Sequence, residues 1–211
     1  IKSVDAKNMS DFLLYGVFIS GIPASTIYLN NFNLFLINLE ILSINGLITN
    51  IVKYGVGRQR PYSHFRTKND DKESFKSFFS GHTSTAFAIG TSTAKILDNY
   101  TQLNSKTIWT TSLGLATLTG YFRIAADKHY FTDIIAGAMV GTLVGYLGFD
   151  ALHDKYVGTR NSKPKYFPNF LTSSLNKNFN GSISFNFIFF GKPPTLWWDF
   201  IFDDLLPEDD L

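Results

Sequence analysis

Residues 123–133 read Arg-Ile-Ala-Ala-Asp-Lys-His-Tyr-Phe-Thr-Asp, and the apolar run 134–140 follows directly. This pattern predicts a turn feeding a helix over about 130–147, with His129 at its start and Asp133 one turn further on. In that geometry the Asp133 carboxylate accepts a hydrogen bond from one imidazole nitrogen, and the other nitrogen is free to attack. Arg123, expected on the preceding helix, adds a planar cation suited to phosphate or carboxylate. The stretch indicates chemistry on an anion, although a lone His–Asp pair is also a common structural contact.

The composition indicates one domain with an unusually aromatic apolar part. The 211 residues suffice for a full core, and nothing demands a second domain. The 21 Phe and 10 Tyr suit a core and a membrane interface alike. A net charge of +2, with no Lys/Arg run interleaved with aromatics, argues against nucleic acid as a partner. The lack of cysteine excludes disulfides and thiolate chemistry, and the start at Ile1 rather than Met leads us to expect a removed leader.

The first part of the chain is apolar but interrupted. Ser10 and Asp11 precede an apolar run that begins at Phe12, which predicts a helix start there. Residues 12–39 contain no Asp, Glu, Lys or Arg, but Gly, Pro and Asn break the stretch, so it lacks one clean span of about 20 apolar residues. Helical spacing of apolar residues predicts a second helix over about 32–54. Glu40, inside it, must face the bundle interior or water.

Two cations frame the turn that ends this second helix. The sequence Gly55-Val56-Gly57 ends the helix and a polar loop follows. Lys53 stands before the turn and Arg60 after it. Arg58, between them, is expected on a solvated face, as is usual for clustered charges.

The sequence Ser80-Gly81-His82 opens a helix of small and apolar residues, predicted over about 83–97. The free amides of a helix start, its positive dipole end and a Ser hydroxyl form an anion cradle, and Gly81 lets the backbone approach closely. His82 is expected at the lip of this cradle. An ordinary capped helix with an exposed His would show the same pattern.

The remaining helices and the tail complete the predicted organisation. A helix over about 107–122 delivers Arg123, and the helix after Asp133, expected to end near 149–150, contains glycines every four residues at 137, 141 and 145, a spacing that permits close helix packing. From 158 the composition shifts to Asn, Lys, Ser, Phe and Pro, and 182–189 alternate like an edge strand. We therefore divide the chain into a helical domain, 1–157, and a C-terminal extension, 158–211, packed on the same domain and assigned no chemistry.

Taken together, the chain contains Lys53-x6-Arg60-Pro61, then Ser80-Gly81-His82, then Arg123-x5-His129-x3-Asp133, in that order. Over about 45–150 this signature resembles the type 2 phosphatidic acid phosphatase superfamily, which includes lipid phosphatases, bacterial acid phosphatases and vanadium haloperoxidases. The chain has Phe79 where the family usually has Pro, and Phe122 where it usually has Ser. Neither change removes a reacting group, but loss of the Ser hydroxyl deletes one phosphate contact, worth roughly 1.5–3 kcal/mol with a charged partner.

The resemblance implies an all-α helical bundle that brings the three motifs to one end, with an irregular C-terminal tail. It implies that His129 attacks phosphorus to give a phosphohistidine, that Asp133 holds the imidazole tautomer, and that His82 protonates the leaving oxygen and later activates water. The phosphate-binding residues would be Lys53, Arg60, Ser80, Gly81 and Arg123. No metal and no other cofactor is expected, because cationic side chains supply the charge that a metal would supply.

The expected substrate is a phosphorylated lipid, either a monoester or a diphosphate. The alternatives are a soluble acid phosphatase for small phosphomonoesters and, more remotely, a vanadium haloperoxidase. The mean hydropathy of +0.02 and the interrupted apolar runs favour a soluble or peripheral protein of a bacterial periplasm facing a membrane surface, with an integral membrane protein as the alternative. Aromatic residues between the first two motifs are expected to line the site mouth: Tyr54, Tyr62, Phe65, Phe75, Phe78 and Phe79.

Overall fold

The computed structural model describes residues 4–65 and 72–157, and all regular structure in these ranges is helical. The long helices are α1 (Val4–Ile19), α3 (Phe32–Val56), α4 (Gly81–Tyr100), α5 (Ser105–Ala125) and α6 (Phe131–Tyr156). The short elements are η1 (Ser20–Ala24) and α2 (Ser25–Leu29), between α1 and α3, and η2 (Pro61–Phe65) and η3 (Lys72–Phe75), between α3 and α4. The predicted all-α bundle is confirmed. The C-terminal extension, with its expected strand and its packing on the bundle, lies outside the described residues.

Two predicted helix boundaries are wrong, and both helices are longer than the apolar pattern indicates. α1 starts at Val4, so Ser10 and Asp11 lie inside it, where the side chain of Ser10 is buried. α6 continues past the predicted end near 149–150 to Tyr156. In both cases the extra turns mix polar and apolar residues, so a search for continuous apolar runs truncates them. Met9 is exposed there, whereas Ser10 and His153 are buried.

α3 matches its predicted range because both of its ends carry clear capping signals. At the start the Asn31 side chain accepts a hydrogen bond from the Asn33 amide at 3.0 Å. At the end Gly57 adopts a left-handed conformation with φ of 59°, and its amide donates to the Lys53 carbonyl. This stop directs the chain into the loop that carries Arg58 and Arg60.

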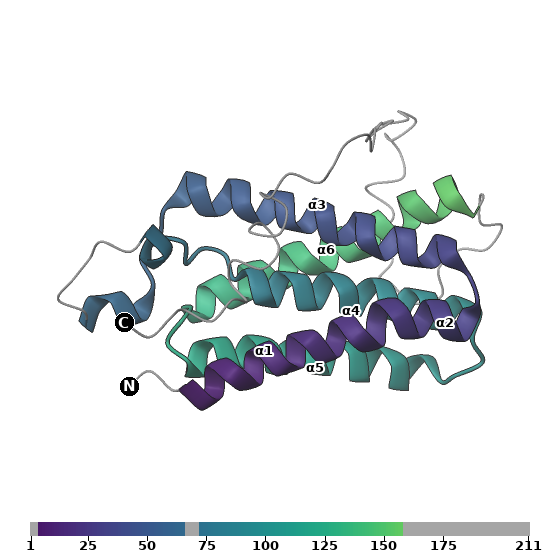
Figure 1. Ribbon diagram of the computed structural model, residues 1–211, viewed down its shortest axis with the longest axis horizontal. Coiled ribbons are helices and arrows are strands. Elements are labelled where there is room, and N and C mark those ends of the chain that lie inside the picture. Colours follow the sequence, from purple (N-terminus) through teal and green to yellow (C-terminus); the bar gives the residue numbers. More distant parts are fainter. Residues whose placement is uncertain (1–3, 66–71, 158–211) are drawn as a thin grey trace.

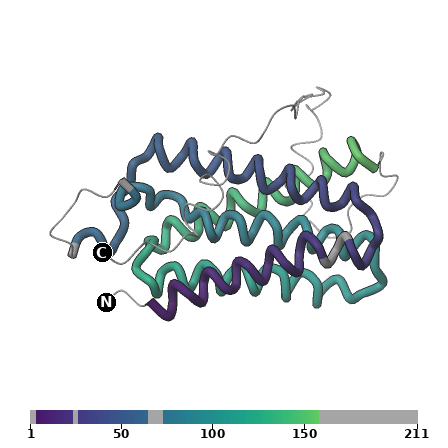
Figure 2. Tube along the Cα trace, viewed as in Figure 1, coloured from purple at the N-terminus to yellow at the C-terminus, as the bar shows by residue number. Residues whose placement is uncertain are grey.

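The centre of the bundle is α4, which packs against α1, α3, α5 and α6. Its buried residues are mostly Ala, Ser, Thr and Gly, and such small side chains let helices approach on several sides at once. Figures 1 and 2 show the five long helices running along the long axis with alternating chain direction. The start of α4, the start of α6 and the ends of α3 and α5 therefore meet at one end of the bundle, on the left of Figure 1.

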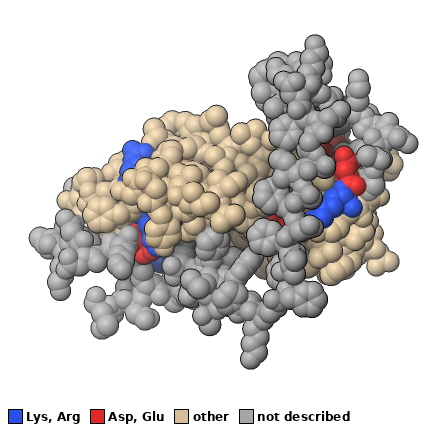
Figure 3. Space-filling view, turned by 90° about the horizontal axis from the view of Figure 1, so that it is seen from above, with Lys and Arg blue, Asp and Glu red and all other residues tan. Residues whose placement is uncertain are grey.

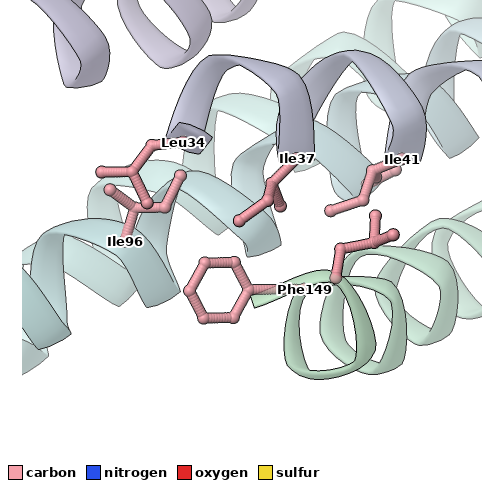
Figure 4. Close-up of a cluster of buried hydrophobic side chains, with 7 residues drawn as sticks. Leu34, Ile37, Ile41, Ile96 and Phe149 are labelled. Carbon is pink, nitrogen blue, oxygen red and sulfur yellow. The ribbon is translucent and has the colours of Figure 1, made fainter. Parts of the chain in front are cut away.

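The largest hydrophobic cluster lies toward the other end, between α3, α4 and α6 (Figure 4). A second cluster joins α1, α4 and α5. The first cluster lies far from the end where α4 and α6 begin, which leaves that end for polar groups. The members of the first cluster are Leu34, Ile37, Ile41, Ala88, Ile96, Phe149 and Leu152, and those of the second are Leu14, Ala86 and Ala116.

The bundle buries several polar side chains beside its apolar core and exposes many large apolar ones. Asn45 on α3 is fully buried; its side chain accepts from the Ser84 hydroxyl at 2.6 Å and donates to the Thr85 hydroxyl at 3.2 Å, both on α4. Closer to the start of α3, the buried Asn38 accepts from the Ser92 hydroxyl of α4. Large apolar side chains instead lie exposed on the outer faces, among them Ile19, Ile51 and Met139. Figure 3 shows one face as a broad uncharged band between charged side chains toward either end.

Within residues 4–65 and 72–157, three segments are long and apolar enough to cross a membrane: Val4–Leu29, Phe32–His64 and Phe131–Tyr156. A helix of 25 residues is roughly 37 Å long, which exceeds the ~30 Å hydrocarbon core of a bilayer. The sequence-based preference for a soluble or peripheral protein is therefore less well supported than the integral alternative. Glu40 is expected from the sequence to face the bundle interior or water. Its carboxylate is 23% exposed and pairs with Lys155 Nζ of α6 at 3.2 Å.

Glycines on α6 bring this helix into direct contact with the backbone of α4, as their spacing predicts. A Cβ atom on Gly141 would lie 2.1 Å from the Ser84 carbonyl oxygen, and one on Gly145 would lie 2.3 Å from the Ala88 oxygen. Both obstacles are backbone atoms, which cannot move aside as a flexible side chain would. Every four residues α6 thus touches α4 at a point where only glycine fits.

We predict that Gly141→Ala destabilises the protein by at least about 1–3 kcal/mol, because the added methyl forces two packed helices apart. Gly114→Ala on α5 is the matched control, because nothing lies within 4 Å of its Cβ position and alanine favours a helix by up to ~1 kcal/mol. Thermal or denaturant unfolding in detergent measures both variants. Equal stability of the two would contradict the close contact.

Candidate active site

The loop end of the bundle gathers the residues of all three sequence motifs. Lys53 lies in the last turn of α3 and Arg60 in the loop that follows, and both are buried. Ser80 caps α4, Arg123 lies in the last turn of α5 as predicted, and His129 lies in the loop before α6. The fold thus brings together side chains from residues 53 to 133.

The His129 ring has a defined tautomer. Its Nδ1 lies 2.8 Å from the Ser77 carbonyl oxygen, and a carbonyl can only accept, so Nδ1 carries the proton. Nε2 then keeps its lone pair. This nitrogen is buried and has no hydrogen-bond partner among the described residues. A buried nitrogen of this kind is available to bond a group that enters the site.

The predicted hydrogen bond from His129 to Asp133 is not formed, which corrects our expectation. The carboxylate stands 3.7 Å from Nδ1, and its Oδ2 accepts instead from the Ser77 hydroxyl at 2.6 Å and from the Tyr130 amide at 3.0 Å. Asp133 therefore holds the Ser77 segment, whose carbonyl in turn orients the imidazole. The carboxylate remains close enough to stabilise positive charge on the ring.

Arg58 also belongs to this site, contrary to its predicted place on a solvated face. Its guanidinium lies 2.5 Å from Asp133 Oδ1 and 2.8 Å from the Thr132 hydroxyl, and it stacks over the Tyr130 ring at 4.2 Å. Its side chain stays 35% exposed, so the residue contacts both the buried carboxylate and solvent. A lone charge in a loop gives no sequence signal for such a contact.

Several cations converge on His129. Burial lowers the pKa of its imidazole well below the usual 6.5, and the positive charges of Arg60, Arg123 and Lys53 lower it further, against the opposing effect of Asp133. The ring is therefore neutral at physiological pH. A neutral imidazole near Arg60, Arg123 and Lys53 can act as a nucleophile toward an anion held by these side chains.

The start of α4 is a capped helix terminus, and its predicted binding of an anion stays a prediction. The Ser80 hydroxyl accepts from the Thr83 hydroxyl at 2.9 Å and caps the Thr83 amide, while the Ser80 amide donates to the Asp133 carbonyl at 3.2 Å. Gly81 occupies the first helical position, where the amide makes no bond within the helix. These contacts place the second motif directly against the third.

His82 is buried rather than exposed at the lip, and its partner comes from an unexpected element. Its Nε2 lies 2.9 Å from Asp11 Oδ1 on α1. The same oxygen lies 3.4 Å from Arg123 Nη1, and the Ser10 hydroxyl lies 3.3 Å from that nitrogen. Sequence reasoning missed Asp11 and Ser10 because it used them as a helix start.

The predicted aromatic mouth is only partly present. Tyr54 and Phe75 are exposed, whereas Tyr62 and Phe79 are buried and therefore support the loop from inside. Phe78 is half-buried, and the side chain of Phe65 lies outside the described set. Among the described residues, no cluster of three or more His, Asp or Glu side chains has the geometry of a metal site.

The fold is a helical bundle that gathers two histidines and several cationic side chains at one end. A family model described as the PAP2 superfamily matches residues 34–156, more than half of the chain. The chain belongs to the PAP2 superfamily, as the three motifs indicate. The matched range contains all the predicted site residues but excludes α1 with Asp11.

The chain is similar to several phosphatases. It is 34% identical to lipid A 1-phosphatase of Porphyromonas gingivalis, over 51% of this chain and 21% of that protein. It is 32% identical to lipid phosphate phosphatase 1 of Arabidopsis thaliana, over 48% of this chain and 39% of that protein. The chain therefore spans well under half the length of these relatives.

A solved structure shares the fold. A transmembrane PAP2 type phosphatidylglycerolphosphate phosphatase from Bacillus subtilis superposes with a TM-score of 0.57 at 21% identity, covering 75% of this chain and 77% of that chain. At this identity the likeness concerns the arrangement of helices.

We predict that the lowered pKa of His129 makes folding pH-dependent. Between the folded value and about 6.5 the unfolded chain binds a proton that the folded chain does not, so the free energy of unfolding falls as pH drops below about 6.5. His129→Gln removes this contribution. Denaturant unfolding at pH 7.5 and pH 5 should show a smaller pH effect in the variant, and an unchanged pH effect would argue against a buried neutral ring.

Proposed function

We propose that this chain hydrolyses the phosphate group of a lipid phosphate monoester or diphosphate through a phosphohistidine on His129. The observation that carries the proposal is the buried, unbonded Nε2 of a neutral imidazole beside Lys53, Arg60 and Arg123. Cations stabilise the charge spread over the phosphoryl oxygens, which is the main task in phosphoryl transfer. The proposed nucleophile thus lies beside the cations that would bind the phosphate group.

In the first step the Nε2 lone pair attacks phosphorus, and the bond from phosphorus to the leaving oxygen breaks. His82 donates the proton that the leaving oxygen takes up. The Ser77 carbonyl keeps its bond to Nδ1–H, and Asp133 stabilises the positive charge that the ring gains. In the second step water attacks phosphorus, His82 accepts its proton, and inorganic phosphate leaves with His129 restored.

The proposed reaction needs no divalent metal. Lys53, Arg60 and Arg123 supply fixed positive charge, and the Gly81 amide and the Ser80 hydroxyl supply donors at the start of α4. Metal ions neutralise developing charge in other phosphoryl-transfer enzymes. Here side chains and backbone amides would take that role.

The lipid part of the proposal rests on the outer surface of the bundle. Apolar outer faces and three segments long enough to span a bilayer support an integral membrane protein, with the site at one end of the helices, near the headgroup level. Both curated relatives carry names of lipid phosphatases. A soluble acid phosphatase is disfavoured by these outer faces. A periplasmic location of the site stays a prediction.

We predict that ³²P-labelled substrate leaves label on His129, stable in base and labile in acid, and that the label forms equally in excess EDTA. His129→Ala should lose the label and lower turnover by roughly three orders of magnitude or more, because the nucleophile is gone. Acid-free quenching and gel autoradiography measure the adduct.

His153→Asn is the matched control, because this histidine is also buried but bonds Tyr100 at 2.7 Å near the other end of α6. Its label should equal that of the wild type. Full turnover by His129→Ala, or label that vanishes in EDTA and returns with Mg²⁺, would overturn the mechanism.

We predict at least a tenfold preference in kcat/KM for a phosphatidate in mixed micelles over para-nitrophenyl phosphate, about 1.4 kcal/mol of differential transition-state binding. Replacing the exposed aromatics at the site end, Tyr54→Ser with Phe75→Ser, should narrow this preference by weakening contact with acyl chains. Phe32→Ser, an exposed aromatic at the start of α3, is the control and should leave the ratio unchanged. Equal rates on both substrates would favour the soluble acid phosphatase.

A further inference from the structure

Asp11 connects α1 to two residues of the proposed reaction. One oxygen of its carboxylate contacts both the His82 ring, at 2.9 Å, and the Arg123 guanidinium, at 3.4 Å. The Ser10 hydroxyl lies between the same groups, 3.4 Å from Asp11 Oδ1 and 3.3 Å from Arg123 Nη1. The carboxylate side chain is only 16% exposed, so this is an interior contact.

We propose that Asp11 is a positioning residue that holds His82 as the general acid and base of the reaction. This inference rests on the proposed function. The contact is specific to α1, which lies outside the range matched by the family model. The proposal therefore gives a role to a helix that carries none of the three motifs.

The geometry explains how the carboxylate would act. A carboxylate only accepts hydrogen bonds, so the proton between the two groups resides on His82 Nε2. The proton for the leaving oxygen then comes from Nδ1 of the imidazolium as the phosphorus–oxygen bond breaks, and Nε2–H stays on Asp11. In the second step water returns a proton to Nδ1 as its oxygen bonds phosphorus. Asp11 fixes the ring and stabilises its charged form throughout.

Arg123 holds Asp11, and Ser10 holds Arg123. The guanidinium approaches the same carboxylate oxygen. The Ser10 hydroxyl donates its one proton to the Lys7 carbonyl at 2.7 Å, and its oxygen accepts from Arg123 Nη1 at 3.3 Å. The carboxylate is thus held by a guanidinium of α5 while it contacts α4. A group held in this way can orient a ring without large loss of conformational entropy during the reaction.

The same contacts allow a second role for Asp11. Its carboxylate could block the site by occupying the position that a substrate phosphate would take beside Arg123. The two cases differ in chemistry. A positioning residue matters most when the leaving group needs a proton, whereas a plug hinders every substrate equally. An alkyl ester expels a strongly basic alkoxide that needs the proton, and nitrophenolate leaves without one.

The test compares Asp11→Asn with the wild type on short-chain phosphatidate and on para-nitrophenyl phosphate, in the same detergent. Asparagine keeps the shape and removes the charge. We expect kcat/KM for the alkyl ester to fall about 100-fold, the lower end of general-acid contributions, and at least tenfold more than for the aryl ester. Asp11→Glu should recover part of the alkyl activity. Retained aryl activity shows that the variant is folded.

Two controls sharpen the comparison. Asp5→Asn removes an exposed carboxylate from the same helix and should leave both rates unchanged. Adding Asp11→Asn to His82→Ala should cause no further loss on the alkyl ester, because the two residues act as a unit.

Equal losses on both esters, or additive losses in the double variant, would overturn the positioning role and leave the proposed function intact. A gain in rate on both esters in Asp11→Asn would overturn it in favour of the plug. A wild-type protein that hydrolyses neither ester would instead remove the proposed function, and the role of Asp11 with it.

Discussion

The close approach of α4 and α6 is the contact on which the rest of the site depends. The glycine ladder that allows it continues to the loop end of the bundle, where a Cβ on Gly137 would lie 2.8 Å from the Ser80 carbonyl oxygen. One turn before Gly137, the Asp133 carbonyl accepts the Ser80 amide. Helix packing thus sets the distance between the start of α4 and the loop that carries His129. Residues without reactive groups determine the geometry of those that have them.

Much of the fold and most of the site could be predicted from the sequence, because both depend on local signals. Helical periodicity located α3, runs of small and apolar residues located α4, α5 and α6, and residue types at fixed spacing identified the motif side chains. Arg58 and Asp11 could not be found in this way, because their partners lie 75 and 71 residues away along the chain. A single charged residue in a loop or helix has many possible environments, and only the packing of helices selects one.

The composition of the whole chain favoured a soluble or peripheral protein, a reading that the apolar outer faces support less well than the integral alternative. A mean hydropathy of +0.02 averages over a polar C-terminal extension and over α4, whose Ser and Thr residues are buried inside the bundle. The helices around α4 present the apolar side chains. A hydropathy averaged over the chain cannot distinguish polar residues buried inside a bundle from polar residues exposed to water. That distinction decides whether a protein suits a bilayer or an aqueous surrounding.

If the chain is the integral membrane protein proposed above, the ion pair between α1 and the rest of the bundle has a consequence for how it enters a bilayer. α1 is the first of the described helices to be synthesised, and it carries Asp11 long before His82 and Arg123 emerge from the ribosome. A carboxylate within an inserting helix costs up to roughly 2.5–3.5 kcal/mol near the bilayer centre and less near its edge. α1 would then settle stably across the membrane only after α4 and α5 arrive, so that biogenesis completes the bundle and its candidate active site in the same event.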